Sequence, residues 1–453
     1  MKKLWLILFF IPVLFAGAQQ LPGQAIISGP MLGQVEMRTA RLWLQVSTDI
    51  SSVTLKYWKE IQPEMGSRQM IEENIKGVFP NEFHTVNFEL NGLDVNTRYK
   101  YQFIINNVIA ASGSFKTKDL WQWHKPAPDF SFLTGSCAYF NEPVYDRPGK
   151  PYGGDSLIFE TMAKDSATFM LWLGDNWYTR EADYGSEWGL WYRASRDRAQ
   201  PVIQQLLKAM PQYAIWDDHD FGPDNSGFSY GLKDISRNIF MNYWCNPFYG
   251  EDQKGTYSQI SYSDVDLFLT DDRYFRSADE MEDSINGKPN PDKHFFGDKQ
   301  LNWIEDALVQ SPATFKIIVI GSQTLNPYSS EEGFYRYSYE YHQLMDFLNR
   351  IKIKGVLFLT GDRHHSEIIK LERPGNYDLY DITVSPFTSG VAKVKGVEIN
   401  NPFRVPGSLV EKRNYAKIGV EGKKNERILK VQINGTNGED LYKWSISENQ
   451  LMH

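Results

Sequence analysis

Polar and apolar residues alternate along the first quarter of the chain. Four segments have the two-residue period of a half-buried strand, namely 41–46, 53–58, 85–90 and 99–105. Turn-forming pairs such as Asn91-Gly92 separate them. Several short strands joined by turns predict a small all-β sandwich of immunoglobulin or fibronectin type over residues 22–118.

The rest of the chain has a different pattern, in which short apolar runs alternate with stretches of helical period. The runs are 130–133, 168–173, 213–216, 265–270, 315–320 and 356–360, and the helical stretches are 201–210, 298–309 and 339–351. Continuous apolar runs are typical of strands buried on both faces. They predict an α/β domain over residues 128–448, joined to the sandwich by a linker at 121–129. Strand-like segments return at 414–446, and we expect them to complete a second sheet packed against the first.

Polar residues with useful chemistry follow most of the apolar runs. These positions include Cys137, Asp175, Asp218, Gln323 and Asp362. Because ligands bind beyond the carboxyl ends of the strands in α/β sheets, the pattern predicts one site. Two metal ions about 4 Å apart can neutralise a phosphate ester and lower the pKa of a bound water. Asp175, directly after a strand and a glycine, is well placed to bridge such a pair.

The N-terminus has the pattern of a secretory signal peptide over residues 1–18. Lys2 and Lys3 precede a short apolar run, and Ala16-Gly17-Ala18 supplies the small residues of a cleavage site. We therefore expect an exported protein, periplasmic or secreted. The run is too short for a comfortable membrane span.

Composition narrows the choice of partners. The net charge of −8 argues against a nucleic-acid-binding surface, and the 42% of hydrophobic residues allows a large core. With only two cysteines, Cys137 and Cys245, a disulfide is one option in an oxidising compartment. The alternative, which we prefer, is that Cys137 binds a metal and Cys245 is a buried thiol.

Four motifs follow one another at the predicted strand ends. They are Gly135-Ser136-Cys137, Gly174-Asp175-Asn176-Trp177-Tyr178, Trp216-Asp217-Asp218-His219-Asp220 and Gly361-Asp362-Arg363-His364. In this order they resemble the motifs of the PhoD-like alkaline phosphatases, a family of calcineurin-like metallophosphoesterases. The resemblance extends over nearly the whole chain after the signal peptide. It implies a four-layer α/β/β/α metallophosphoesterase domain behind the β-sandwich.

Carried over residue by residue, the resemblance implies a ferric site. Its ligands would be Cys137, Asp175, Tyr178 and His364. Thiolate and tyrosinate are anionic donors that suit a trivalent ion. The Lys2-Lys3 start differs from the twin-arginine signal that many PhoD-like enzymes carry, so zinc or manganese is the alternative to Fe(III) at this site.

A second metal site is expected beside the first. Asp175, Asp218, Asp362 and, as an option, Gln323 would provide an all-oxygen ligand set, which selects hard cations such as Ca²⁺ or Mg²⁺. Calcium agrees with the resemblance. Asp217 is also a candidate ligand, although an orienting role like that of Asp220 is the other interpretation.

Three residues are candidates for contact with the substrate. His219 could protonate the leaving oxygen. Arg273 and Arg276 could bind a phosphate oxygen, and a salt bridge from either arginine to a nearby acid such as Asp271 is an equally good interpretation. His365 is expected to be structural, because adjacent strand residues point to opposite faces. The tract Trp172, Trp177, Trp188, Trp191 and Tyr192 is expected to pack in the core rather than to line the site.

Together these features predict an exported phosphatase or phosphodiesterase. It would hydrolyse a small organic phosphate ester through a metal-activated water or hydroxide, as a monomer and without nucleic acid or membrane partners. Two alternatives belong to other classes: a surface binding protein with a degenerate phosphatase fold, and an exported nuclease.

Overall fold

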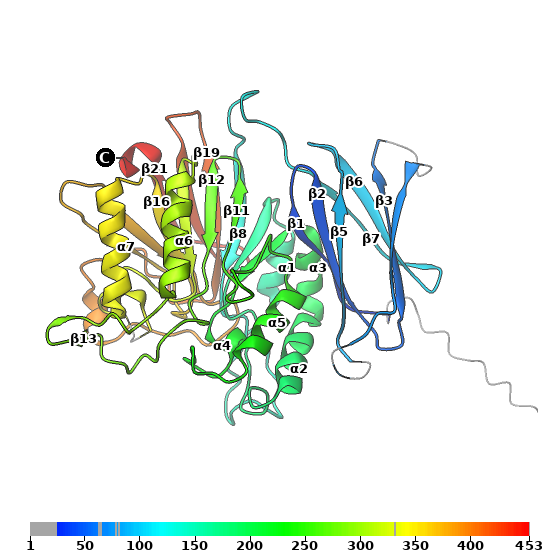
Figure 1. Ribbon diagram of the computed structural model, residues 1–453, viewed down its shortest axis with the longest axis horizontal. Coiled ribbons are helices and arrows are strands. Elements are labelled where there is room, and N and C mark those ends of the chain that lie inside the picture. The colour runs from blue at the N-terminus through cyan, green and yellow to red at the C-terminus, as the bar shows by residue number, and fades with distance from the viewer. Residues whose placement is uncertain (1–24, 62–65, 78, 80–81, 330–331, 453) are drawn as a thin grey trace, which may run out of the picture.

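The computed structural model describes residues 25–61, 66–77, 79, 82–329 and 332–452 (Figure 1). The predicted signal peptide at 1–18 lies outside these residues. Within them, no helix is long and apolar enough to cross a membrane.

Seven strands between residues 26 and 116 form the predicted sandwich, drawn in blue to cyan at the right of Figure 1. One sheet has the order β1-β2-β5 and the other β4-β3-β6-β7. The strands are β1 (Ile26–Val35), β2 (Thr39–Val46), β3 (Ser52–Lys59), β4 (Arg68–Glu73), β5 (His84–Asn91), β6 (Arg98–Ile105) and β7 (Val108–Lys116). Alternate residues, such as Val53, Leu55 and Tyr57 of β3, are buried in a shared core, as the two-residue period predicts.

The α/β domain contains two six-stranded sheets. The first has the order β10-β9-β8-β19-β20-β21 and the second β11-β12-β15-β16-β18-β17. The first consists of β8 (Phe130–Gly135), β9 (Phe169–Leu173), β10 (Gln212–Ile215), β19 (Asn414–Glu421), β20 (Ile428–Gly435) and β21 (Asp440–Ser447). The second consists of β11 (Ser258–Tyr262), β12 (Val265–Leu269), β15 (Phe315–Ile320), β16 (Val356–Thr360), β17 (Glu367–Leu371) and β18 (Leu379–Thr383), and β13 (Ser284–Ile285) and β14 (Lys288–Pro289) form a separate hairpin.

The C-terminal strands correct one expectation. Instead of completing the second sheet, β19 pairs antiparallel with β8, so that β19 to β21 extend the first sheet. Ala416, Ile418 and Val420 of β19 are buried in the same core as Phe132 of β8. The pairing therefore places the apolar face of β19 in the core that the two sheets share.

Helices cover the outer faces of both sheets, which gives the four-layer α/β/β/α arrangement. On β9, Met170 and Trp172 face the helices of one side, whereas Leu171 and Leu173 face the second sheet. The first side has α1 (Leu157–Ala163), α2 (Glu187–Arg198), α3 (Pro201–Ala209) and α5 (Lys233–Tyr243), and the second has α6 (Gly297–Gln310) and α7 (Ser338–Ile351). Short elements are α4 (Asp218–Phe221) and the 3₁₀ turns η3 (Phe334–Arg336), η4 (Gly396–Asn400) and η5 (Glu448–Leu451).

The sandwich docks tightly against the helices of the first side (Figure 1). Trp43 of β2 is fully buried and its indole nitrogen donates to the carbonyl oxygen of Asn242, 2.7 Å away. Gly33 of β1 lies directly on Cys245, so that a Cβ atom at position 33 would lie 2.3 Å from the Cβ of Cys245. Cys245 is therefore a buried contact between the two domains. Both it and Cys137 are free thiols, so the disulfide option is excluded.

This contact makes Gly33→Ala a test of domain docking. The added methyl group overlaps Cys245 within a well-packed interface, so unfolding free energy should fall by about 1–3 kcal/mol in chemical denaturation. Gly185→Ala is the matched control, because no atom lies within 4 Å of the added group. Equal stability of the two variants would contradict the tight interface.

Candidate metal centre

The backbone is left-handed at four of the predicted ligand positions. The φ angles are 65° at Cys137 after β8, 51° at Asp175 after β9, and 65° and 55° at Asp362 and His364 after β16. Residues with a Cβ rarely adopt this region, and such strain clusters at functional sites. The turns aim side chains from both sheets at one place.

The first cluster consists of Cys137, Asp175 and His364, with Tyr178 beside them. The donor atoms of the first three lie within 4.8 Å of one another. The Tyr178 hydroxyl donates to Asp175 Oδ2 at 2.8 Å and lies 3.1 Å from His364 Nε2. A thiol, a carboxylate, a phenol and an imidazole thus converge as the predicted ligand set requires.

The electrostatics of this cluster favour a cation. Burial, followed by the charge of Asp218, raises the pKa of Asp175 well above its usual value. Burial and then the charge of Asp175 likewise raise the pKa of Cys137 and of Tyr178. Burial lowers the pKa of His364 to about 4, so its imidazole is neutral near pH 7 and has a lone pair for a metal. A bound cation would reverse the cost of ionising the three acids.

A second cluster shares Asp175 with the first. Donor atoms of Asp175, Asp218 and His219 also lie within 4.8 Å of one another. Burial opposes ionisation of Asp218, but His219 and Arg273 outweigh it and hold its pKa below the usual range. The His219 ring lies against Tyr178, with 4.1 Å between ring centroids, and its Nε2 is 3.5 Å from the exposed Asp224.

Asp217 and Asp220 hold the turns that carry these candidate ligands. Asp220 accepts hydrogen bonds from the backbone nitrogens of Asn176, Trp177 and Asp217, and from the Asn176 side chain. Asp217 caps α4 and pairs through Oδ1 with Arg273 Nε at 2.6 Å. Asp217 Oδ2 is buried and has no hydrogen-bond partner among the described residues. One oxygen of Asp217 is therefore engaged by the protein and the other is not.

Arg273 and Arg276 are buried against acids rather than exposed in an open site. Arg273 also pairs with Glu332 at 3.2 Å, while Asp271 accepts from its backbone nitrogen. Arg276 pairs with Asp279 at 2.8 Å and donates to the Glu332 carbonyl. The salt-bridge option thus holds for both residues, with acids other than Asp271.

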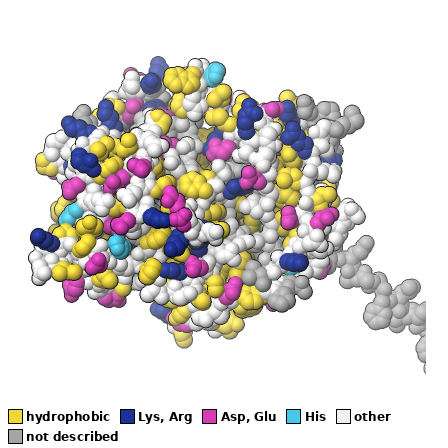
Figure 2. Space-filling model, in the orientation of Figure 1, with side chains coloured by type: hydrophobic (Ala, Val, Ile, Leu, Met, Phe, Trp, Pro, Cys, Tyr) yellow, Lys and Arg dark blue, Asp and Glu magenta, His cyan; other side chains and the backbone are white. Residues whose placement is uncertain are grey.

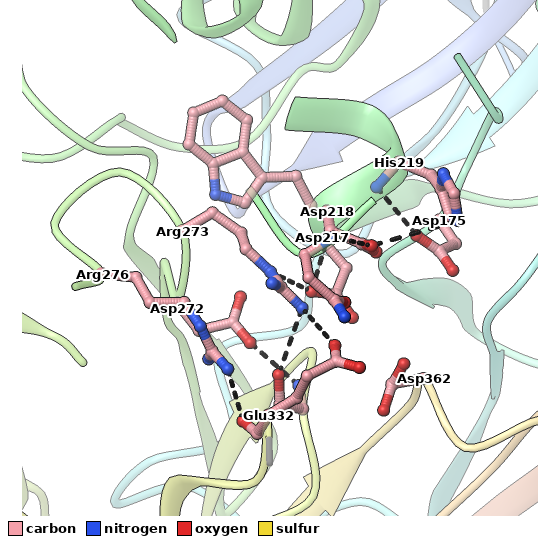
Figure 3. A network of polar contacts seen from close by, with 12 residues as sticks. Asp175, Asp217, Asp218, His219, Asp272, Arg273, Arg276, Glu332 and Asp362 are labelled. Atoms are coloured by element: carbon pink, nitrogen blue, oxygen red, sulfur yellow. Dashed lines mark hydrogen bonds and ion pairs between the residues drawn. The ribbon is translucent and has the colours of Figure 1, made fainter. Parts of the chain in front are cut away.

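Glu332 was not predicted from the sequence. Its carboxylate lies between Arg273 and Asp362 in Figure 3. Burial and then the charge of Asp362 raise its pKa to about 8. Asn225, also unpredicted, donates from its backbone to Asp218 Oδ2 at 2.8 Å and places its side-chain amide 2.8 and 2.9 Å from the two oxygens of Glu332. Both residues lie outside the motifs, in loops without a distinctive pattern.

Gln323 does not join the predicted oxygen ligands. Its amide nitrogen donates to Glu367 at 2.8 Å and to Thr383 at 3.0 Å, and its oxygen accepts from Asn326 at 2.9 Å. Both amide hydrogens are used and the oxygen already accepts one hydrogen bond, so Gln323 belongs to a buried network with Glu367 and Asn326, which does not favour its use as a ligand.

His365 and most of the aromatic tract lie in the interior as expected, whereas Trp188 does not. His365 is 2% exposed and lies 3.5 Å from Glu367. Trp172, Trp177 and Trp191 are buried in the core of the first side. Trp188 is 44% exposed and stacks on Tyr192, whose hydroxyl donates to Glu142.

Tyr152 is a further residue that sequence reasoning missed. It lies in the loop between β8 and α1, and its hydroxyl is 2.9 Å from His364 Nδ1. No motif includes it, because the contact depends on how the loop folds back over the site.

A buried ion pair with two acids should be costly to break. Arg273→Met leaves Asp217 and Glu332 without their partner and should lower unfolding free energy by about 3–5 kcal/mol. Arg147→Met is the control, since Arg147 and Glu181 are 86% and 61% exposed, and the expected loss is below about 1 kcal/mol. If urea denaturation shows similar losses of unfolding free energy for Arg273→Met and Arg147→Met, the assigned network is contradicted.

Comparison with known proteins places this chain in a family. A family model described as PhoD-like phosphatase matches residues 132–401. Alkaline phosphatase D of Bacillus subtilis is 22% identical over 354 residues, an alignment that covers 68% of this chain and 58% of that protein. The chain therefore belongs to the PhoD-like phosphatase family, which confirms the resemblance read from the motifs.

Solved structures support the fold. A structure of PhoD superposes with a TM-score of 0.74 at 16% identity and covers 96% of this chain and 92% of that one. The purple acid phosphatase PPD1 from yellow lupin (Lupinus luteus) seeds gives 0.64 at 11% identity, with coverage of 92% and 74%. Both likenesses confirm the predicted arrangement of an α/β domain with an N-terminal β-sandwich.

Proposed function

We propose that this protein is an exported, metal-dependent phosphoesterase that hydrolyses small organic phosphate esters. The observation that supports this most directly is the pair of clusters that share Asp175. A shared carboxylate is the usual way to hold two cations close together. Bound at these clusters, metal ions would neutralise the phosphate and lower the pKa of an attacking water.

The donor sets suggest different ions at the two clusters. Cys137, Asp175, Tyr178 and His364 form a mixed sulfur, oxygen and nitrogen set with three acidic donors, which suits Fe(III), with zinc or manganese as the alternative. At the second cluster, Asp175 and Asp218 offer carboxylate oxygens, and Asp362, which lies outside the cluster, is proposed as a further oxygen ligand; such donors suit Ca²⁺ or Mg²⁺. Asp217 could contribute only through its unpartnered Oδ2.

His219 is the proposed acid for the leaving group. Its ring is partly exposed, at 22% of the side chain, and lies beside the shared Asp175 and Asp218. The exposed Asp224 faces its Nε2 at 3.5 Å and can orient the ring. A histidine so placed can donate a proton to a departing oxygen. Arg273 keeps one buried guanidinium nitrogen, Nη1, without a hydrogen bond among the described residues, which is the donor it could offer to a phosphate oxygen.

The proposed substrate is small rather than a polynucleotide. On the face drawn in Figure 2, basic and acidic side chains are interspersed, and the whole chain carries a net charge of −8. A polynucleotide would need a continuous basic surface. Export is proposed from the pattern of residues 1–18. A monomeric state is part of the same proposal.

The shared carboxylate provides the first test. Asp175→Asn removes a negative charge from both clusters, so hydrolysis of an aryl phosphate should fall by more than about 100-fold, while circular dichroism is unchanged. Asp165→Asn is the control, because Asp165 pairs with Lys417 outside both clusters. Diester and polynucleotide substrates are assayed alongside. Wild-type activity of Asp175→Asn would refute the phosphoesterase assignment.

Absorption spectroscopy tests the first metal. A tyrosinate bound to Fe(III) should give a visible charge-transfer band, which Tyr178→Phe should abolish. Tyr139→Phe should retain the band, since the Tyr139 ring lies 5.0 Å from that of Tyr178 but its hydroxyl donates to Asp146. Elemental analysis of the same sample identifies the ions. A colourless, fully active wild-type protein would refute the ferric assignment and leave the phosphoesterase proposal standing.

A further inference from the structure

We propose that Tyr152 is the positioning residue that fixes the orientation and tautomer of His364 in the metal centre. This role rests on the proposed function, because it presupposes that His364 binds a metal. The supporting contact is the 2.9 Å approach between the Tyr152 hydroxyl and His364 Nδ1.

The two ring nitrogens of His364 have separate surroundings. Nε2 faces the cluster, at 3.1 Å from the Tyr178 hydroxyl and 3.3 Å from the Ser389 hydroxyl. Nδ1 faces Tyr152 on the opposite side. A metal-binding nitrogen must offer its lone pair, so Nδ1 carries the hydrogen and donates it to Tyr152. Such a bond to the outer nitrogen sets the ring orientation and strengthens metal binding.

Tyr152 is half exposed, yet its backbone is held from several directions. Gly153 exchanges two hydrogen bonds with the Asn141 side chain, at 2.8 and 2.9 Å. Gly154 donates to the Thr388 carbonyl at 2.7 Å, and Arg413 donates to the carbonyl of Tyr152 at 3.3 Å. The loop therefore presents the phenol in one place before any ligand binds.

The Tyr152 ring occupies space that a glycine leaves free. A Cβ atom at Gly390 would lie 2.5 Å from Cε2 of Tyr152. On another side the ring meets Tyr139 edge-on, with centroids 4.9 Å apart. The side chain is thus fitted to the mouth of the site rather than lying loosely on its surface.

A phenol is also a suitable partner on grounds of charge. Carboxylates are common partners of metal-bound histidines. Here Asp175 and Asp218 already belong to the clusters and Asp362 lies close by, so several like charges repel one another at the site. A neutral hydroxyl orients the imidazole without adding to that repulsion.

Tyr152→Phe tests the role, because it removes the hydroxyl and keeps the ring. Full-length protein loaded with iron, or with zinc in a parallel series, is challenged with a chelator, and retained metal is measured. We expect affinity to fall about 10-fold or more with no change in melting temperature. Tyr145→Phe, a half-exposed tyrosine in the same loop, should match the wild type. Unchanged affinity in Tyr152→Phe would overturn the proposal.

Gly390→Ala is an independent second variant. The added methyl group displaces the Tyr152 ring, although the side chain keeps its hydroxyl. The hydroxyl then no longer lies beside His364, so metal retention should also weaken. Tyr178→Phe serves as the ligand-deletion reference and should lose more metal than either. If Tyr152→Phe holds its metal as tightly as the wild type, the role of Tyr152 is overturned, whatever Gly390→Ala does. A wild-type protein that holds no metal would overturn the metal centre itself, together with this role.

Discussion

Buried negative charge is the constraint on which this structure depends. Asp175, Asp217 and Asp218 lie together in the interior, with Asp362 and Glu332 close by, and burial opposes the ionisation of each, so that the pKa is raised in all but Asp218. Burying an ionised carboxylate without a partner costs several kcal/mol. Arg273 offsets part of that cost, and the remainder is the physical reason to expect cations at the site.

The rest of the fold holds these carboxylates at fixed positions relative to one another. Two sheets supply the ligand-bearing turns, and their shared core prevents the turns from moving apart. Asp220 ties the turn after β9 to the turn after β10 through three hydrogen bonds from Asn176 and Trp177. Behind them, the sandwich packs on the helices through Trp43 and Gly33, so it supports the layer beneath the site, while both clusters are built from residues of the α/β domain.

Much of this organisation could be predicted from the sequence, and the failures have physical causes. Helices with a clear apolar stripe, such as α3, α6 and α7, were predicted to within about two residues at each end. Helix α2 was missed because it buries Arg193 and Arg198 beside its apolar residues, which hides the stripe. The pairing of β19 with β8 joins segments nearly 300 residues apart, and no local pattern encodes such a pairing.

The site residues also fall into those that the sequence motifs predict and those that only the folded structure reveals. Residues that follow strands in recognisable motifs, such as Asp175 and Asp362, could be placed near the site from their positions, and their roles as ligands stay a prediction. Glu332, Asn225 and Tyr152 lie in loops, and their roles come from contacts that only the folded chain creates. Gln323 also follows a strand, as the candidate ligands do. Its amide, however, makes hydrogen bonds within a separate buried network.

The left-handed turns at Cys137, Asp175, Asp362 and His364 limit how this centre can change over evolutionary time. Among residues with a side chain, asparagine, aspartate and histidine adopt that conformation most readily, and β-branched residues adopt it least. A lineage that exchanges one metal for another must therefore draw its new ligands from a short list. The backbone conformation at these turns thus restricts which residue types can stand there, independently of which of them would give an active enzyme.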